Sequence, residues 1–207
     1  MKYDRLVAFG CSLTYGHGLR DCYSGKRKTG PGKEPSKYAW PSVLADILGI
    51  DCCNLSSPGA SNKRIAYTVY NTELFENDIV LLNWSYADRY CIITDNTIID
   101  LAVAQKGAWK GKINTAFRHL ANRHDLMLDS IMRLDYIDLY LDKHKITNFC
   151  MLTDKKDFGN YRNNNILETS IGEIFPNFPR AIDKLHPGEE AHAHFAQEIY
   201  REIKDRL

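Results

Sequence analysis

A serine in a glycine-bounded turn is the first residue of this chain whose type and position could do chemistry. Ser12 lies in the segment 10–16, which reads GCSLTYG and directly follows the apolar run 6–9. A serine between glycines at the end of a strand can project its hydroxyl into a cleft above a parallel sheet. A serine hydroxyl in water is a poor nucleophile, so this role requires a base. The alternative is that Ser12 only caps the helix after the turn.

A carboxylate and an imidazole near the other end of the chain could supply that base. Among the seven histidines, His186 stands apart because Asp183 precedes it by three residues and Pro187 follows it. In a turn, this spacing lets the carboxylate hold one imidazole nitrogen while the other nitrogen faces a cleft. The pair can therefore act as a general base, although an ordinary turn hydrogen bond remains the alternative.

Alternating strands and helices must position these groups. Apolar runs predict buried strands at 6–10, 50–55, 79–82 and 146–152. Apolar residues at helical spacing predict helices at 41–48 and 60–75, one or two helices across 117–141, and a closing helix at 188–207. This order favours an α/β fold with a parallel sheet covered on both faces. Segments 85–112 and 153–180 are irregular and are expected to be inserts in one domain spanning 1–207.

The two motifs together resemble those of SGNH/GDSL-type serine hydrolases, a family of esterases and lipases. That family has a G-D-S-x-T-x-G-like turn near the N-terminus and an Asp-x-x-His pair near the C-terminus. Segment 10–16 matches the first motif except for Cys11 in place of aspartate, and segment 183–186 matches the second. The resemblance implies a three-layer α/β/α sandwich with a mainly parallel, flavodoxin-like sheet. It also implies Ser12 as nucleophile, His186 as base and then acid, and Asp183 as orienting carboxylate, with no cofactor and no metal.

The oxyanion hole is where the chain departs from the family pattern. The resemblance assigns backbone donors to Ser12 and to Gly59, which lies in the segment 54–62 after the second expected strand. The family's G-x-N-D turn after the third strand is replaced by the sequence NWSY at 83–86. Either the Asn83 amide or the Ser85 hydroxyl could donate there, and the sequence does not decide between them. Losing one such donor typically costs about 10² to 10³ in rate.

Side chains close to these motifs are candidate substrate contacts. Trp84, Tyr86 and Tyr90 follow the third expected strand, where aromatic rings could stack on a sugar, and Asn62 closes the segment that contains Gly59. Packing in the interior is the alternative for the aromatic residues. Cys11 is expected to face the core as a small apolar side chain rather than to act as a nucleophile.

Composition argues against several classes of partner. With 27 basic and 26 acidic residues the formal net charge is +1, so no nucleic-acid or membrane-surface binding is expected. Apolar runs are too short for a signal peptide or a membrane span, and the six cysteines include no CxxC pair. A cytoplasmic, reduced location is therefore expected. The basic loop 25–37 lacks the P-loop pattern and is expected to be solvated.

These features predict an enzyme that hydrolyses an ester. The resemblance and the aromatic residues favour an O-acetyl or other short acyl group on a carbohydrate as the substrate. One alternative is a lipid or thioester esterase, although the chain lacks a long apolar stripe for an acyl chain. Another is a non-catalytic glycan-binding or assembly protein that keeps the fold, as the altered turn at 83–86 would allow.

Overall fold

Four parallel strands form the central sheet of the computed structural model, which describes residues 2–22, 32–102, 112–159, 161 and 163–207. The strands are β1 (Arg5–Phe9), β2 (Asp51–Asn54), β3 (Asp78–Trp84) and β6 (Thr147–Leu152), in the order β2-β1-β3-β6. Each neighbouring pair is parallel. In this flavodoxin-like arrangement, the carboxyl ends of the parallel strands lie along one edge of the sheet. The expected parallel α/β sheet is confirmed.

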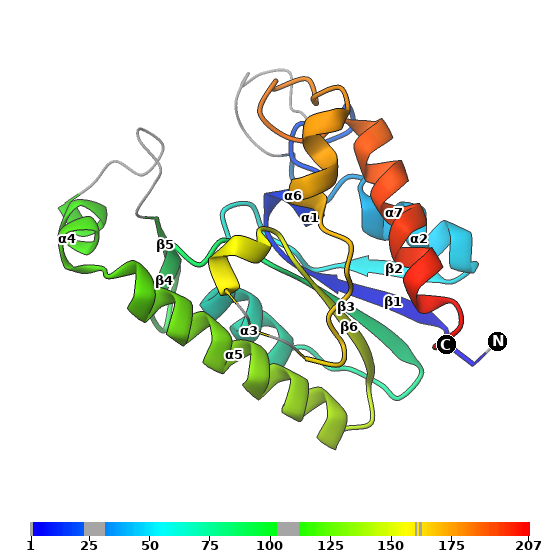
Figure 1. Cartoon of the computed structure of the whole chain (residues 1–207), viewed down its shortest axis with the longest axis horizontal. Helices are drawn as coiled ribbons and strands as arrows, with labels where there is room; N and C mark the ends of the chain where they lie inside the picture. The colour runs from blue at the N-terminus through cyan, green and yellow to red at the C-terminus, as the bar shows by residue number, and fades with distance from the viewer. Residues whose placement is uncertain (1, 23–31, 103–111, 160, 162) are drawn as a thin grey trace.

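Helices cover both faces of this sheet (Figure 1). Helices α2 (Trp40–Leu48) and α7 (Glu189–Ile203) pack together on one face, and α3 (Asn62–Tyr70) and α5 (Arg123–Lys143) pack together on the other. All residues of β3 are buried, because this central strand is covered on both sides. Helix α2 carries Pro41 in its first turn and ends at Gly49 in the left-handed conformation, as its sequence predicts.

One segment differs from the expected elements, and in another the chain adopts one of the two expected arrangements. The irregular segment after β3 contains an antiparallel pair, β4 (Arg89–Ile93) and β5 (Ile98–Ala102). The long amphipathic stretch forms two helices, α4 (Lys112–Leu120) and α5, because the Asn122 side chain accepts a hydrogen bond from the N–H of His124 and starts a new helix. The basic part of the loop 25–37 falls largely within 23–31, which lies outside the described residues, as do 103–111 of the first insert.

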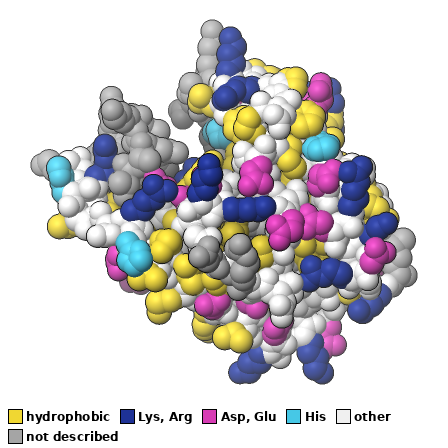
Figure 2. Space-filling model, viewed as in Figure 1, with side chains coloured by type: hydrophobic (Ala, Val, Ile, Leu, Met, Phe, Trp, Pro, Cys, Tyr) yellow, Lys and Arg dark blue, Asp and Glu magenta, His cyan; other side chains and the backbone are white. Residues whose placement is uncertain are grey.

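Short helical segments complete the chain: α1 (Ser12–Tyr15), η1 (Lys155–Phe158), α6 (Ile171–Ile174) and η2 (Phe175–Asn177). Basic and acidic side chains are interspersed on the face shown in Figure 2, in keeping with a formal net charge of +1.

Among the residues that the structure describes, no helix combines the length and the apolar character needed to cross a membrane.

Candidate active site

Ser12 begins a single helical turn at the end of β1. Cys11 occupies the position before the helix, and its carbonyl accepts hydrogen bonds from the N–H groups of Thr14 and Tyr15. Gly16 ends the turn with φ +78°, a conformation that favours glycine. Ser12 is therefore inside the turn and is not its cap, and 6% of its surface is exposed. The Cys11 side chain lies in the hydrophobic core.

Asp183 holds His186 through both of its carboxylate oxygens. Oδ1 accepts hydrogen bonds from the N–H groups of Leu185 (2.9 Å) and His186 (3.0 Å), and Oδ2 lies 2.5 Å from His186 Nδ1. Lys184 turns the chain with φ 59°, which lets the carboxylate face the ring three residues later. Burial acts to raise the pKa of Asp183, but these hydrogen bonds outweigh it and hold the pKa below its usual value. Asp183 is thus ionised and fixes the orientation of the imidazole.

Segments from the N-terminal and the C-terminal parts of the chain meet at one pocket. Its volume is about 420 Å³, and it is lined by Ser12, Leu13, Tyr86, Asp88, Arg89, Phe175, Leu185 and His186. The N–H of Ile182 donates to the carbonyl of Gly18 (3.1 Å), which ties the loop of the Asp-x-x-His motif to the segment after α1. A Cβ on Gly18 would lie 2.7 Å from the Asp183 carboxylate, so this close approach requires glycine. The three residues proposed as a triad are therefore brought to one place.

His17 is a member of this site that the sequence reasoning did not single out. Its ring stacks on that of His186, with centroids 4.4 Å apart and planes at 23°. Burial lowers the pKa of His17, and the nearby His186 lowers it further, while Asp183 acts in the opposite direction. His17 therefore presents a neutral ring against one face of the imidazole. The sequence feature that could have pointed to His17 is its position just after Gly16, because the end of the helical turn brings the chain back beside Ser12.

The same three side chains form a cluster of metal-ligand type. His17, Asp183 and His186 offer ligand atoms within 4.8 Å of one another among the described residues. A histidine binds a metal through a lone pair in the plane of its ring, and the His17 and His186 rings are stacked nearly parallel. Their lone pairs do not converge on one point, and Asp183 already contacts Nδ1. The arrangement favours a histidine–carboxylate pair over a metal centre.

The candidate oxyanion donors differ in what they already bind. Gly59 has φ +80° in the turn before α3, and the N–H of Ser57 in this turn donates to the carbonyl of Gly10 (3.1 Å), which holds the turn beside the end of β1. The Asn83 amide donates to Thr14 Oγ1 (3.1 Å) and accepts from Thr153 Oγ1 (3.3 Å). Asn83 is fully buried. Its amide therefore joins the turn of the serine to the end of β6.

Ser85 is likewise buried and bound within the protein. Its N–H donates to Asn62 Oδ1 (2.7 Å), its carbonyl accepts from Asn62 Nδ2 (3.1 Å), and its hydroxyl accepts from Arg89 (2.9 Å). Asn62 also donates to Ser130 Oγ (3.0 Å), so both ends of its amide bind protein groups. Neither Asn62 nor Ser85 is among the described residues that line the pocket.

The aromatic candidates separate into different environments. Tyr86 lines the pocket. Trp84 is 1% exposed and packs in the hydrophobic core, as the last residue of a strand covered on both faces. Tyr90 accepts a hydrogen bond from Lys63 Nζ (3.0 Å) and stacks on Phe117, because β4 points it away from the face that carries Arg89. Only Tyr86 of these three therefore lies where a substrate in this pocket would touch it.

Comparison with solved structures supports the fold on which this site is built. The acetyl xylan esterase Est2A from the rumen bacterium Butyrivibrio proteoclasticus is similar with a TM-score of 0.61 and 13% identity, over 99% of this chain and 65% of that one. A lipolytic protein of the G-D-S-L family from Desulfitobacterium hafniense is similar with a TM-score of 0.57 and 12% identity, over 95% and 98%. The esterase EstA from Pseudoalteromonas sp. is similar with a TM-score of 0.57 and 14% identity, over 99% and 98%.

The similarity is confined to structure. No protein-family model matches the sequence, and no curated protein sequence matches it. The chain has the fold of GDSL/SGNH lipolytic proteins and carbohydrate esterases.

Proposed function

We propose that this protein is a serine esterase that uses Ser12, His186 and Asp183 as a catalytic triad. The observation that carries the proposal is the 2.5 Å contact between Asp183 Oδ2 and His186 Nδ1 at the pocket that Ser12 also lines. A carboxylate on Nδ1 leaves Nε2 as the nitrogen that can take a proton from a serine. The fold shared with esterases and lipases supports the same reaction class.

In the proposed reaction, Ser12 Oγ attacks the ester carbonyl and its proton moves to His186 Nε2. The carbonyl oxygen becomes an oxyanion, stabilised by the backbone N–H groups of Ser12 and Gly59. Asp183 stabilises the imidazolium that forms. The C–O bond to the alcohol then breaks, His186 protonates the leaving oxygen, and an acyl-serine remains. Water, deprotonated by His186, attacks this acyl group and releases a carboxylic acid and the free serine.

The proposed substrate is a short acyl group, such as acetate, on a carbohydrate. The pocket of about 420 Å³ suits a small acyl group, and Tyr86 in its wall offers a ring face on which a sugar could stack. Similar folds include the acetyl xylan esterase Est2A and carbohydrate esterases of family two from Cellvibrio japonicus and Clostridium thermocellum. These similarities are compatible with an acetylated carbohydrate, and the small pocket favours a short acyl group over a long acyl chain.

A paired labelling and turnover experiment tests the triad. Wild type, Ser12→Ala and the control Ser42→Ala, a serine on α2, are treated with a fluorophosphonate probe and assayed on 4-nitrophenyl acetate. Wild type and the control should label and turn over, and Ser12→Ala should do neither. Full activity in Ser12→Ala would refute its role as nucleophile. Activity that survives in Ser12→Ala but is lost on thiol alkylation would point to Cys11.

The substrate is tested separately by acetate release from acetylated xylan oligosaccharides. Release that depends on Ser12 supports the proposed carbohydrate ester. Turnover of 4-nitrophenyl acetate without any release would refute the carbohydrate and keep the esterase. If wild type neither labels nor turns over any ester, the enzyme proposal fails, and binding of the same oligosaccharides by calorimetry would favour a non-catalytic glycan-binding protein.

A further inference from the structure

Arg89 places a buried positive charge in the wall of the pocket that Ser12 and His186 line. It is the first residue of β4, and only 8% of its surface is exposed. One guanidinium nitrogen donates to Ser85 Oγ (2.9 Å), and the group lies over the Tyr86 ring, 4.9 Å from its centroid. Both contacts hold the guanidinium in position without neutralising its charge.

Acidic side chains near Arg89 form salt bridges with other residues, although Arg89 still attracts the Asp100 carboxylate. Asp100 pairs with Arg64, and Asp157 pairs with Arg123 while also accepting the N–H of Ala87 (3.2 Å). Asp88 lines the same pocket and also interacts with another group of the protein. Within the described part of the chain, Arg89 forms no salt bridge with any of these groups. Among the described residues, Asp100 attracts Arg89 without forming a salt bridge with it.

A buried guanidinium has lost most of its water, and a neutral hydroxyl and a ring face do not supply the negative charge that would compensate for this loss. Here the cation borders an open pocket, so a ligand in the pocket can supply that negative charge. The planar fork of a guanidinium fits a carboxylate with two parallel hydrogen bonds. We propose that Arg89 binds a carboxylate carried by the substrate, which makes the protein selective for acidic esters.

This inference rests on the proposed esterase function and narrows its substrate. The carboxylate takes no part in the chemistry: the ester and one water give the acid and the alcohol as before. It can belong to the acyl half, as in a half-ester of a dicarboxylic acid, or to the alcohol half, as in an acetylated acidic sugar. Both place the same anionic group beside Arg89, and the experiment separates them.

Two pairs of esters test the inference, each matched in size and differing in charge. The acyl pair is 4-nitrophenyl hydrogen glutarate and 4-nitrophenyl methyl glutarate. The alcohol pair is 4-acetoxybenzoate and 4-acetoxybenzamide. At neutral pH, wild type should hydrolyse the acidic member of one pair with a kcat/KM about 10- to 100-fold higher than its neutral partner, the range expected for hydrogen bonds to a charged group. The pair that shows this preference identifies which half carries the carboxylate.

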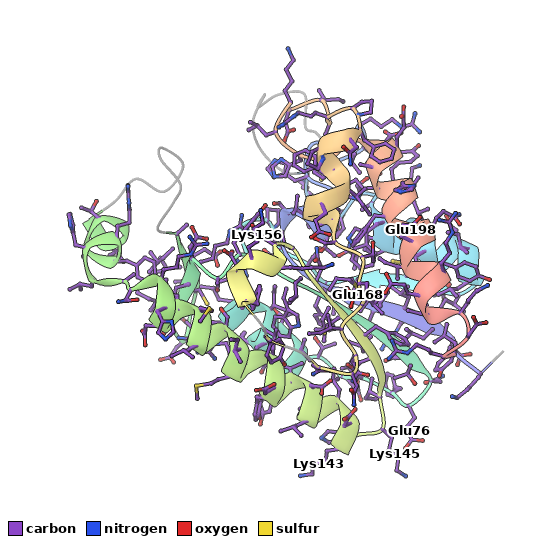
Figure 3. All side chains as sticks on the ribbon, viewed as in Figure 1. Glu76, Lys143, Lys145, Lys156, Glu168 and Glu198 are labelled. Atoms are coloured by element: carbon purple, nitrogen blue, oxygen red, sulfur yellow. The ribbon has the colours of Figure 1, made fainter. Side chains whose placement is uncertain are left out.

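Substitution assigns the preference to Arg89. In Arg89→Met the ratio of acidic to neutral kcat/KM should fall to about one, and Arg89→Lys should keep part of it, because the charge stays but the fork is lost. Lys143→Met is the control, because it removes one positive charge from an exposed residue at the end of α5. Lys143 is labelled in Figure 3, and this end of α5 lies far from α1 in Figure 1. Its ratio should equal that of wild type.

Several outcomes would overturn the inference. Equal kcat/KM within both pairs in wild type would do so without any variant, and so would a preference that survives in Arg89→Met. An equal loss on acidic and neutral esters would show that Arg89 only positions Ser85 and Tyr86. If no ester is turned over, the esterase proposal fails by itself, and the anion site is then tested with glutarate. A rise in Tm with glutarate in wild type but not in Arg89→Met supports the site, and no rise in wild type refutes it.

Discussion

His192 is expected to make the folded protein less stable in acid. It lies on α7 with no exposed surface, and its Nδ1 accepts a hydrogen bond from the backbone N–H of Trp40 (3.2 Å). The ring is therefore neutral, with its proton on Nε2, a buried atom without a partner among the described residues. Burial lowers the pKa of His192 from 6.5 to about 3, with a smaller contribution from the charge of His186.

The direction and size of the effect follow from proton linkage. Between these two pKa values the unfolded chain protonates His192 and the folded protein does not, so the stability present above pH 6.5 is lost as the pH falls. The loss approaches about 1.4 kcal/mol for each pH unit and amounts to about 2.3 kcal/mol from pH 6.5 to about 4.5, because the unfolded histidine is already half protonated at pH 6.5. The lowered pKa of His17 acts in the same direction. The folded protein should therefore lose stability in mild acid, before its carboxylates titrate fully.

Denaturant unfolding at several pH values between about 7 and 4.5 measures this dependence. The variant His192→Asn keeps an acceptor near the position of Nδ1 but cannot titrate. Its smaller side chain lowers stability at every pH, whereas the pH dependence should become shallower by about 1 kcal/mol per unit. His119→Asn, a change at an exposed residue of α4, is the control and should keep the wild-type slope. Parallel slopes in wild type and His192→Asn would refute the reasoning.

Two substitutions, one of Asp183 and one of the glycine that packs against it, test how the site is held in place. Asp183→Asn keeps the shape of the turn but removes the charge and presents an amide N–H to His186 Nδ1. The kcat on 4-nitrophenyl acetate should therefore fall about 10³- to 10⁴-fold. A change of less than tenfold would argue against the triad. Gly18→Ala puts a Cβ 2.7 Å from the Asp183 carboxylate at a residue with φ +90°. The circular dichroism spectrum should stay that of a folded protein. The kcat should fall about 100-fold, because a displacement of about 1 Å in a catalytic group lowers the rate by that much. An unchanged kcat would show that the loop moves aside without disturbing the site.

The strands and the Asp-x-x-His motif could be predicted because their signals are local. Apolar runs form most of β1, β3 and β6, since a parallel strand covered on both faces buries nearly all of its side chains. Gly49 and Pro41 likewise limit α2 within its own segment. The three-residue spacing of Asp183 and His186 carries its own geometry, because the carboxylate binds the backbone of the same turn.

The missed features depend on contacts between distant segments. His17 is one histidine among seven, and only the folded chain brings it against a residue 169 positions away. Within the described residues, strands β4 and β5 pair only with each other, and β4 holds just five residues, too few to show a clear alternation. Arg89 is a single charge in a polar segment. Its significance lies in its burial beside the pocket without a salt bridge among the described residues, and a sequence displays neither property.

The polar residues at the end of β3 act as a scaffold for the site. Asn83 joins Thr14, two residues after Ser12, to Thr153 beyond β6. Ser85 joins α3 through Asn62 and β4 through Arg89. These contacts hold the turn of Ser12, helix α3, strand β4 and the segment after β6 in fixed positions relative to one another. The proposed oxyanion hole then rests on the backbone N–H groups of Ser12 and Gly59, whose positions are set by the turns themselves and not by side-chain rotamers.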